Sequence, residues 1–310
     1  MTEDRLLIES FINTLNDKEI EWLLENDEFD AINSGKARKL SFITVNNRKI
    51  LNHSKARLGV FGLVNKLIQK ARQEKFNENV QSGVDSNKIR IVSEGDSWFN
   101  YPTQLKEVID RIFDRYSIFS LGYAGDWLSN IYIENEYIPA IRKYRPEIFL
   151  ISGGGNDMVG GGRMEEVLNK YSGNDNIDHL LNHKEFNSIL DDFKIIFTSI
   201  FEKLKIEFPE LKIICHGYDY PYLDGEEKKW FGKPMREKGI NNIATRKTIG
   251  NYMIDEFNEM LKKVATEYPR VYYLDLRGKV PRDKWFDELH PNDEGFKIVA
   301  DLYNKMIESI

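Results

Sequence analysis

The chain has 310 residues and a formal net charge of −6 at pH 7. This length suits one large domain or two smaller ones, and the balance of apolar and charged residues is that of a globular protein. The negative net charge argues against a general attraction to nucleic acid, so no specific nucleic-acid partner is predicted.

The expected location is the cytoplasm. Residues 1–5 contain no basic segment leading into an apolar core, so no signal peptide is predicted. No run approaches the roughly 18 apolar residues of a membrane span, so no transmembrane segment is expected. The single cysteine, Cys215, lies in an apolar strand-like run and is expected to be a buried thiol.

Residues 1–85 are predicted to form a small helical N-terminal domain. Apolar residues recur at helical spacing over residues 3–24 and again over residues 55–75. Residues 81–87 have the polar, turn-forming composition of a linker. Because a domain with its own core folds alone, we expect this one to serve targeting or assembly and to be dispensable for chemistry.

The charge of this N-terminal region is uneven. Residues 1–30 carry ten acidic and two basic side chains, whereas residues 31–75 carry eleven basic and one acidic. The basic segment is a candidate contact for an anionic surface or a protein partner. A solvated surface, or two faces that complement each other within the domain, is the favoured interpretation.

From residue 88 onward, strand and helix patterns alternate. Strands are expected at residues 89–93, 117–121, 147–152, 212–217 and 271–276, and helices at residues 104–115, 127–144, 186–208, 248–267 and 293–309. Strands that alternate with helices of this length predict parallel βαβ units with right-handed crossovers. Residues 86–310 are therefore predicted to form an α/β fold, a three-layer α/β/α sandwich with a five-stranded, mainly parallel, flavodoxin-like sheet.

The first candidate for chemistry is Ser97, in the run Glu94-Gly95-Asp96-Ser97-Trp98 after the first predicted strand. A serine hydroxyl attacks a carbonyl only when a neighbouring base takes its proton. Serine is also a common helix cap, which is the favoured interpretation of this residue seen alone. Asp96 is expected to hold the turn that presents the serine.

The base and its orienting group are offered by Asp287 and His290, which lie three residues apart near the C-terminus. A histidine takes the serine proton, and a carboxylate fixes its tautomer and stabilises its charged form. His290 alone could be an ordinary loop histidine. Its occurrence together with Ser97 and Asp287 predicts a catalytic triad.

Two glycine-rich turns lie between these runs, each after a predicted strand. Gly125 lies in the turn over residues 122–126, and Asn156 lies in the turn over residues 153–157. Glycine lets a backbone N–H approach a ligand closely, and asparagine offers a neutral side-chain donor. Acyl transfer needs such donors at the oxyanion of its tetrahedral intermediate.

These four fragments resemble the sequence blocks of the SGNH hydrolases, also called the GDSL esterase/lipase family, which carry Ser, Gly, Asn and His in this order. The resemblance covers roughly residues 88–310, and Trp98 departs from it because the family usually has Leu there. It implies a triad of Ser97, Asp287 and His290, with no cofactor and no metal. It also implies an oxyanion hole made by Ser97, Gly125 and Asn156.

The leading hypothesis is a serine esterase that hydrolyses carboxylic esters, either a lipid ester or an O-acetylated carbohydrate, through an acyl-enzyme on Ser97. Two alternatives stay open: an acyltransferase with the same triad, and a non-enzymatic interaction module. The long connections over residues 158–183 and 218–247 are expected to border the substrate cleft. Their aromatic residues would either line that cleft or pack the loops onto the domain: Tyr218, Tyr220, Tyr222 and Trp230.

Overall fold

The computed structural model describes residues 60–101, 105–225, 228 and 230–310. The predicted helix over residues 3–24 lies outside the described residues. The chain divides into two compact units, Met1–Ile151 and Ser152–Ile310.

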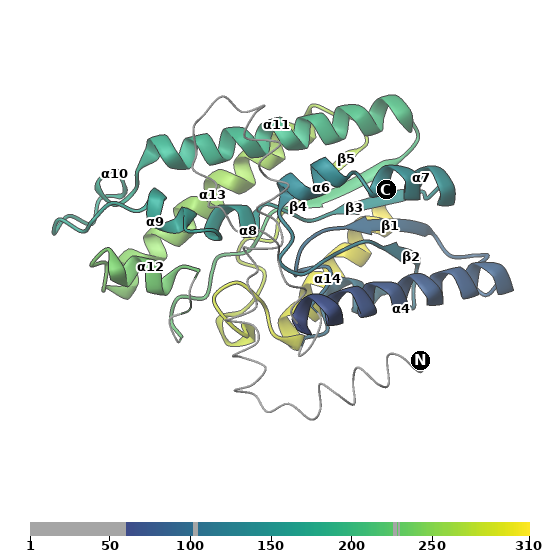
Figure 1. Cartoon of the computed structure of the whole chain (residues 1–310), viewed down its shortest axis with the longest axis horizontal. Coiled ribbons are helices and arrows are strands. Elements are labelled where there is room, and N and C mark those ends of the chain that lie inside the picture. The colour runs from purple at the N-terminus through teal and green to yellow at the C-terminus, as the bar shows by residue number, and fades with distance from the viewer. Residues whose placement is uncertain (1–59, 102–104, 226–227, 229) are drawn as a thin grey trace. The chain divides into compact units, whose positions relative to one another are not determined.

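The strands form one five-stranded sheet in the order β2-β1-β3-β4-β5 (Figure 1). They are β1 (Arg90–Glu94), β2 (Ser117–Ser120), β3 (Ile148–Ile151), β4 (Lys212–His216) and β5 (Val271–Leu274). β1 pairs in parallel with both β2 and β3, and β4 pairs in parallel with β5. The flavodoxin-like order is confirmed, and the predicted strands agree with the observed ones to within two residues at each end.

The first unit adds helices to β1, β2 and β3. They are α4 (Val60–Ser82), α5 (Val108–Ile112), α6 (Leu128–Glu134) and α7 (Tyr137–Tyr144). The single helix predicted over residues 127–144 is wrong, because Asn135 has a left-handed φ of +58° that ends α6. Asparagine adopts this conformation more readily than most residues, so the helical pattern on either side does not reveal the break.

Helix α4 packs along β2 within the first unit (Figure 1). The ring of Phe76 in α4 lies 5.5 Å from the ring of Phe119 in β2 and 5.0 Å from the ring of Tyr144 in α7. The helix runs to Ser82, into the segment predicted as a linker. Residues 60–82 therefore share the aromatic core of the first unit.

The second unit contains most of the long helices. Its helices are α8 (Gly155–Val159), α9 (Arg163–Val167), α10 (Ile177–Leu180), α11 (His183–Glu207), α12 (Gly232–Glu237), α13 (Ile243–Thr266) and α14 (Asp293–Ser309), with a short 3₁₀ turn η1 (Arg282–Lys284). The three longest begin after an asparagine cap, at Asn182, Asn242 and Asn292, whose side-chain oxygen accepts a first-turn N–H.

Helices cover both faces of the sheet in this unit. The register places Cys215 beside Tyr273 and His216 beside Leu274, and successive side chains of a strand point to opposite faces. The Tyr273 hydroxyl donates to Asn258 of α13 at 2.5 Å, whereas the His216 ring lies 5.9 Å from Tyr303 of α14. α13 and α14 therefore lie on opposite sides of β4 and β5, as the predicted sandwich requires.

Cys215 is confirmed as a buried thiol, and burial raises its pKa above the ordinary value. The next residue but one, Gly217, allows α13 to approach the end of β4. A Cβ atom at this position would lie 1.7 Å from Oδ1 of Asn258, which is sterically impossible without a shift of the helix.

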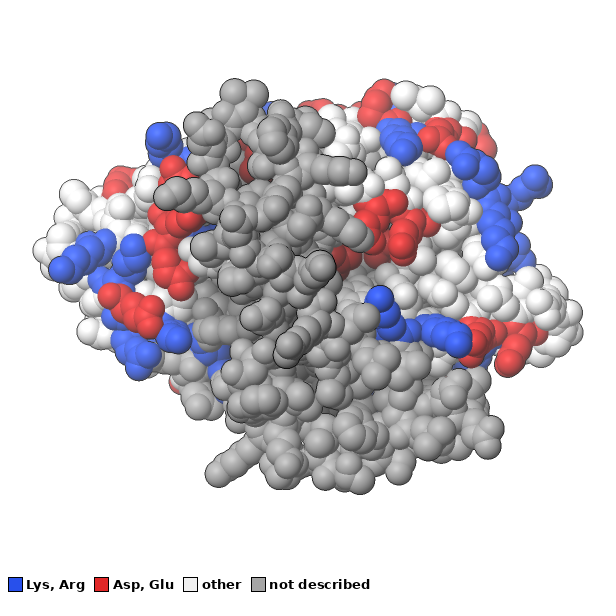
Figure 2. All heavy atoms as spheres, in the orientation of Figure 1, with Lys and Arg blue, Asp and Glu red and all other residues white. Residues whose placement is uncertain are grey.

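Charged side chains of both signs occur in small groups on the visible surface of the described residues (Figure 2). The acidic segment over residues 1–30 and most of the basic segment lie outside the described residues. The anionic-surface or protein partner of this region therefore stays a prediction, as does the cytoplasmic location. None of the helices that the structure describes has the length and apolar character needed to span a bilayer.

Candidate active site

Ser97 lies in a hydrogen-bonded turn directly after β1. The Asp96 carboxylate accepts the N–H of Trp98 at 3.0 Å, and the Asp96 carbonyl accepts the N–H groups of Phe99 and Asn100 at 3.0 and 3.1 Å. Asp96 therefore holds the turn, as the sequence predicts. The turn fixes the backbone of Ser97, and this residue is largely buried.

The turn that carries Gly125 follows β2, the parallel neighbour of β1, so both turns leave the same edge of the sheet. The Tyr123 N–H donates to the Gly95 carbonyl at 2.8 Å, which ties the two turns together. Gly125 has φ +81°, a left-handed conformation that favours glycine. A residue with a Cβ would be strained here.

Asn156 lies in the first turn of α8, which begins soon after β3. The preceding Gly154 has φ +106°, and a Cβ there would lie 2.8 Å from the ring of Phe257. The N–H of Gly155 donates to the Tyr218 hydroxyl at 3.1 Å. Close packing and this hydrogen bond therefore set the backbone from which the Asn156 side chain extends.

Asp287 and His290 form a buried hydrogen-bonded pair. Nδ1 of His290 lies 2.9 Å from each carboxylate oxygen of Asp287, and the two side chains are 7% and 6% exposed, respectively. Oδ1 of Asp287 also accepts the N–H groups of Leu289 and His290, both at 2.8 Å. The carboxylate is therefore held beside the ring by hydrogen bonds within its own turn.

This contact decides which nitrogen of His290 can act as a base. An ionised carboxylate only accepts hydrogen bonds, so Nδ1 must carry a proton to bond to Asp287. In the neutral ring, Nε2 is then unprotonated and carries the lone pair. The pair supplies a base at Nε2 and a negative charge that stabilises the ring once it is protonated.

Glu288, between these two residues, holds a neighbouring loop in place. Its Oε1 accepts the backbone N–H groups of Lys228 and Gly232 at 2.9 and 2.8 Å, and its Oε2 accepts that of Phe231 at 2.9 Å. Burial raises the pKa of Glu288 to about 7, against the three N–H donors that lower it. Only the structure shows this role, because the partners lie more than fifty positions away in sequence.

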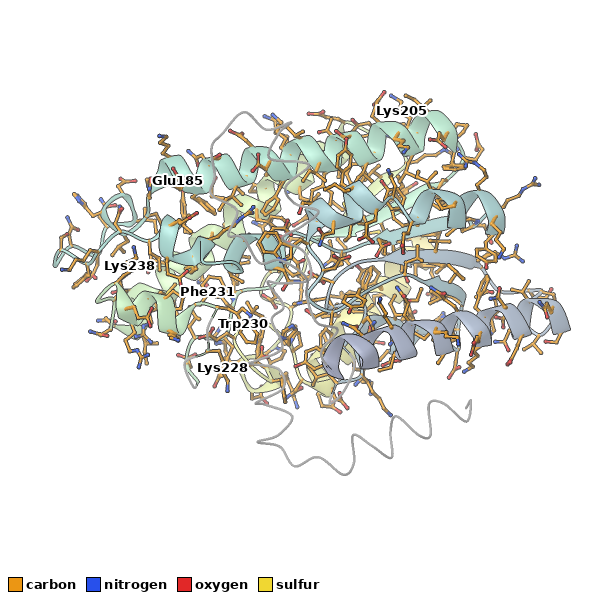
Figure 3. The ribbon with its side chains drawn as sticks, in the orientation of Figure 1. Glu185, Lys205, Lys228, Trp230, Phe231 and Lys238 are labelled. Atoms are coloured by element: carbon orange, nitrogen blue, oxygen red, sulfur yellow. The ribbon has the colours of Figure 1, made fainter. Side chains whose placement is uncertain are left out.

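The held loop brings an aromatic ring to the histidine. Lys228, Trp230 and Phe231 lie in the segment that leads into α12 (Figure 3). The Trp230 ring lies 5.9 Å from the His290 ring at an angle of 77°, an edge-to-face contact. Trp230 is therefore placed to shape the surroundings of the candidate base.

The three tyrosines of the same connection are engaged elsewhere. The Tyr218 ring packs 5.6 Å from Phe257, and the Tyr220 hydroxyl donates to Asp255 at 2.9 Å. The Arg282 guanidinium lies 5.0 Å from the centre of the Tyr222 ring. Loop packing, one of the two predicted roles, therefore accounts for these contacts.

The candidate residues fall into two groups. Ser97 and Gly125 lie in the first compact unit, while Asn156, Asp287 and His290 lie in the second. The structure ties the turns of the first two together and joins Asp287 to His290. Over the ranges that the structure describes, no group of three or more His, Cys, Asp or Glu side chains could hold a metal ion.

Comparison with known families gives a match over most of the chain. The sequence model of the GDSL-like lipase/acylhydrolase family matches residues 79–298. This range contains all five candidate residues and begins inside α4, so residues 60–78 precede it. A search of curated proteins finds no match.

Several solved structures are similar at low sequence identity. Phospholipase A1 from Streptomyces albidoflavus NA297 is 14% identical with a TM-score of 0.49, over 70% of this chain and 99% of that one. The lipase Lip_vut3 from a goat rumen metagenome is 12% identical with a TM-score of 0.48, over 70% and 96%. An extracellular lipase from Streptomyces rimosus is 12% identical with a TM-score of 0.45, over 70% and 98%. These likenesses are loose, and the family assignment rests on the sequence model.

Proposed function

The chain belongs to the GDSL-like lipase/acylhydrolase family, and we propose that it is a serine esterase in which Ser97 is the nucleophile. His290 is the general base, and Asp287 orients it. The family supports ester hydrolysis in general, and the assignment of these three roles is our proposal. The observation that carries it is the Asp287–His290 pair, whose 2.9 Å contacts to Nδ1 leave Nε2 as a base.

In the first half of the reaction, Oγ of Ser97 attacks the ester carbonyl carbon while Nε2 of His290 takes the hydroxyl proton. The carbonyl electron pair moves onto its oxygen. The N–H groups of Ser97 and Gly125 and the side-chain amide of Asn156 donate to that oxyanion. The bond to the alcohol then breaks, and the imidazolium returns its proton to the departing oxygen.

In the second half, water hydrolyses the acyl-enzyme. His290 takes a proton from water, which attacks the same carbonyl carbon, and the second tetrahedral intermediate is held by the same donors. The bond to Oγ breaks, Ser97 recovers its proton from His290, and the carboxylic acid leaves.

The proposed substrate is a lipid ester or an O-acetylated carbohydrate. Trp230 supports this class, since its ring lies against His290 and offers an apolar surface to an acyl chain or a sugar ring. The distinction is made with p-nitrophenyl esters of increasing acyl length and with acetylated sugars. A preference for long chains would favour the lipid ester, and release of acetate from the sugars would favour the carbohydrate.

The same assay tests the nucleophile. Full-length Ser97→Ala is expected to lose hydrolysis of the best ester, whereas Ser199→Ala, at a half-buried position of α11, is expected to keep it. Full activity in Ser97→Ala would overturn the proposal. If an added alcohol takes the acyl group in place of water, the result would favour the acyltransferase alternative over the esterase.

A further inference from the structure

Helix α4 presents a row of polar side chains to the end of β2 and the turn beyond it. Asn65, Gln69 and Gln73 are spaced by four residues, so they share one face of the helix. Nε2 of Gln73 donates to the Ser120 carbonyl at 2.9 Å, and Nε2 of Gln69 donates to the Leu121 carbonyl at 2.6 Å. The helix thus makes hydrogen bonds along the chain from the end of β2 toward the turn that carries Gly125.

At the end of this row, Asn65 clamps one residue from both sides. Its Oδ1 accepts the N–H of Ala124 at 3.1 Å, and its Nδ2 donates to the carbonyl of Ala124 at 3.0 Å. The side chain is fully buried. Since a buried amide is costly to leave without partners, these bonds fix the side chain and the backbone of Ala124 together.

The carbonyl of Ala124 belongs to the same peptide group as the N–H of Gly125. That group is planar and trans, so its C=O and N–H point in opposite directions. An amide that holds the carbonyl from behind therefore fixes the direction of the Gly125 N–H. A donor to the carbonyl also polarises the peptide and strengthens the N–H as a donor.

The same side chain also reaches the Ser97 turn. Nδ2 of Asn100, three residues after the nucleophile, donates to Oδ1 of Asn65 at 2.9 Å and to the Gly122 carbonyl at 2.9 Å. Nη1 of Arg72, also in α4, donates to the Phe99 carbonyl at 3.0 Å. The turn that carries Ser97 and the turn that carries Gly125 are therefore both hydrogen-bonded to α4.

We propose that Asn65 is a positioning residue for acyl transfer, which aims the oxyanion donor of Gly125 and locks its turn to that of Ser97. This inference rests on the proposed function. The residue precedes the part of the chain matched by the family, which begins at residue 79. It also reverses, for α4, the expectation that residues 1–85 are dispensable for chemistry: a fragment that begins at residue 86 would lack the clamp.

The test compares two variants of the full chain with a matched control. Asn65→Leu keeps a similar size and removes all three hydrogen bonds, and Asn65→Asp keeps the acceptor but sets an oxygen against the Ala124 carbonyl. The control is Asn77→Leu, an asparagine of the same helix whose Oδ1 accepts the Tyr144 hydroxyl at 3.2 Å, away from both turns. Each is assayed for kcat and KM on p-nitrophenyl acetate and for its melting temperature.

A misdirected donor weakens transition-state binding more than substrate binding. We therefore expect both Asn65 variants to lose about 10- to 100-fold in kcat with little change in KM, by comparison with the roughly 10²-fold cost of small misplacements at active sites. Asn77→Leu should keep its kcat. If Asn65 had only a structural role, its variants would have a lower melting temperature and a smaller active fraction. Their kcat per folded molecule would then equal that of the control.

Wild-type kcat in folded Asn65 variants, or an equal loss in Asn77→Leu, would overturn the inference. If Asn65→Leu fails to fold, the nearly isosteric Asn65→Asp decides the matter. Failure of the proposed function looks different, because the wild-type protein would then be inactive or Ser97→Ala would remain active in the same assay.

Discussion

His290 and Asp287 are joined through a single ring nitrogen: Nδ1 lies 2.9 Å from both carboxylate oxygens. The carboxylate is in turn fixed by two backbone N–H groups, those of Leu289 and of His290 itself. A turn of four residues thus contains the base, its orienting group and the donors that hold the orienting group. The tautomer of the histidine follows from this arrangement.

Asp287→Asn should lower kcat on the order of 10⁴-fold, as expected when the charge that sets the histidine tautomer is lost. The amide can donate to Nδ1, which would move the ring proton to Nε2 and remove the base. The measurement is kcat on p-nitrophenyl acetate at equal folded protein. Asp283→Asn, an exposed carboxylate on η1, is the control, and a small effect at Asp287 would contradict the assigned role.

Glu288→Gln should loosen the loop that carries Trp230. A carboxylate accepts three backbone N–H groups here, whereas the amide nitrogen of glutamine would face donors and repel them. Hydrogen exchange should become faster at the amides of Lys228, Phe231 and Gly232. Exposed Glu237→Gln, at the end of α12, should leave those amides unchanged, and unchanged exchange in Glu288→Gln would rule out the anchoring role.

Arg72→Met should cost about 3–5 kcal/mol of unfolding free energy, because it leaves a buried carboxylate without its partner. Arg72 is buried and pairs with Glu107, which is also buried, and with Asp110 at 2.7 Å. Removing both charges, in Arg72→Met with Glu107→Gln, should restore part of the loss. Denaturant unfolding measures the free energy of unfolding of each variant. Lys75→Met is the control, because it removes an exposed ion pair on the same helix. Equal stability of the two single variants would contradict the prediction.

Glu94→Gln should flatten the dependence of stability on pH. Burial, followed by the charges of Asp126 and Glu136, raises the pKa of Glu94 well above its ordinary value of 4.5. Between these two pKa values the folded state binds more protons than the unfolded state, so stability falls as pH rises above 4.5 and levels off beyond the raised pKa. Glutamine keeps the acceptor for the Gly95 N–H and does not titrate.

The measurement for Glu94 is the free energy of unfolding at a series of pH values from 4 upward. The wild-type protein and Glu78→Gln, an exposed substitution on α4, should lose stability as pH rises through this window. Glu94→Gln should lose less. Parallel curves for all three proteins would show that the Glu94 carboxyl titrates as an ordinary exposed group.

The sheet could be predicted from sequence because each strand is a short apolar run closed by a glycine-rich or polar turn. Such runs predict parallel strands when the helices between them are long enough for right-handed crossovers. The short helices α9, α10 and α12 lie within the two segments that the sequence predicts as long connections, since elements of four to six residues show no clear period. Their placement depends on tertiary contacts that a local pattern does not contain.

The candidate residues could be identified because acyl transfer requires these residue types, and because their order along the chain resembles that of the family's sequence blocks. The hydrogen bonds that hold these residues in place could not be predicted in the same way. The hydrogen bonds of Asn65 and Glu288 span 59 and up to 60 positions of sequence, and both side chains are polar residues in buried places. A pattern of apolar residues indicates which face of a helix is buried. It does not show that a polar side chain on that face forms hydrogen bonds with the backbone of a distant turn.

Covalent labelling with a fluorophosphonate tests most directly whether Ser97 is the nucleophile. The probe is attacked by an activated serine, loses fluoride and stays attached to Oγ, so peptide mapping by mass spectrometry locates the adduct. We predict one adduct per chain, on Ser97, that is lost in Ser97→Ala and strongly slowed in His290→Ala. An adduct on a different serine, or no adduct on folded wild-type protein, would contradict the account.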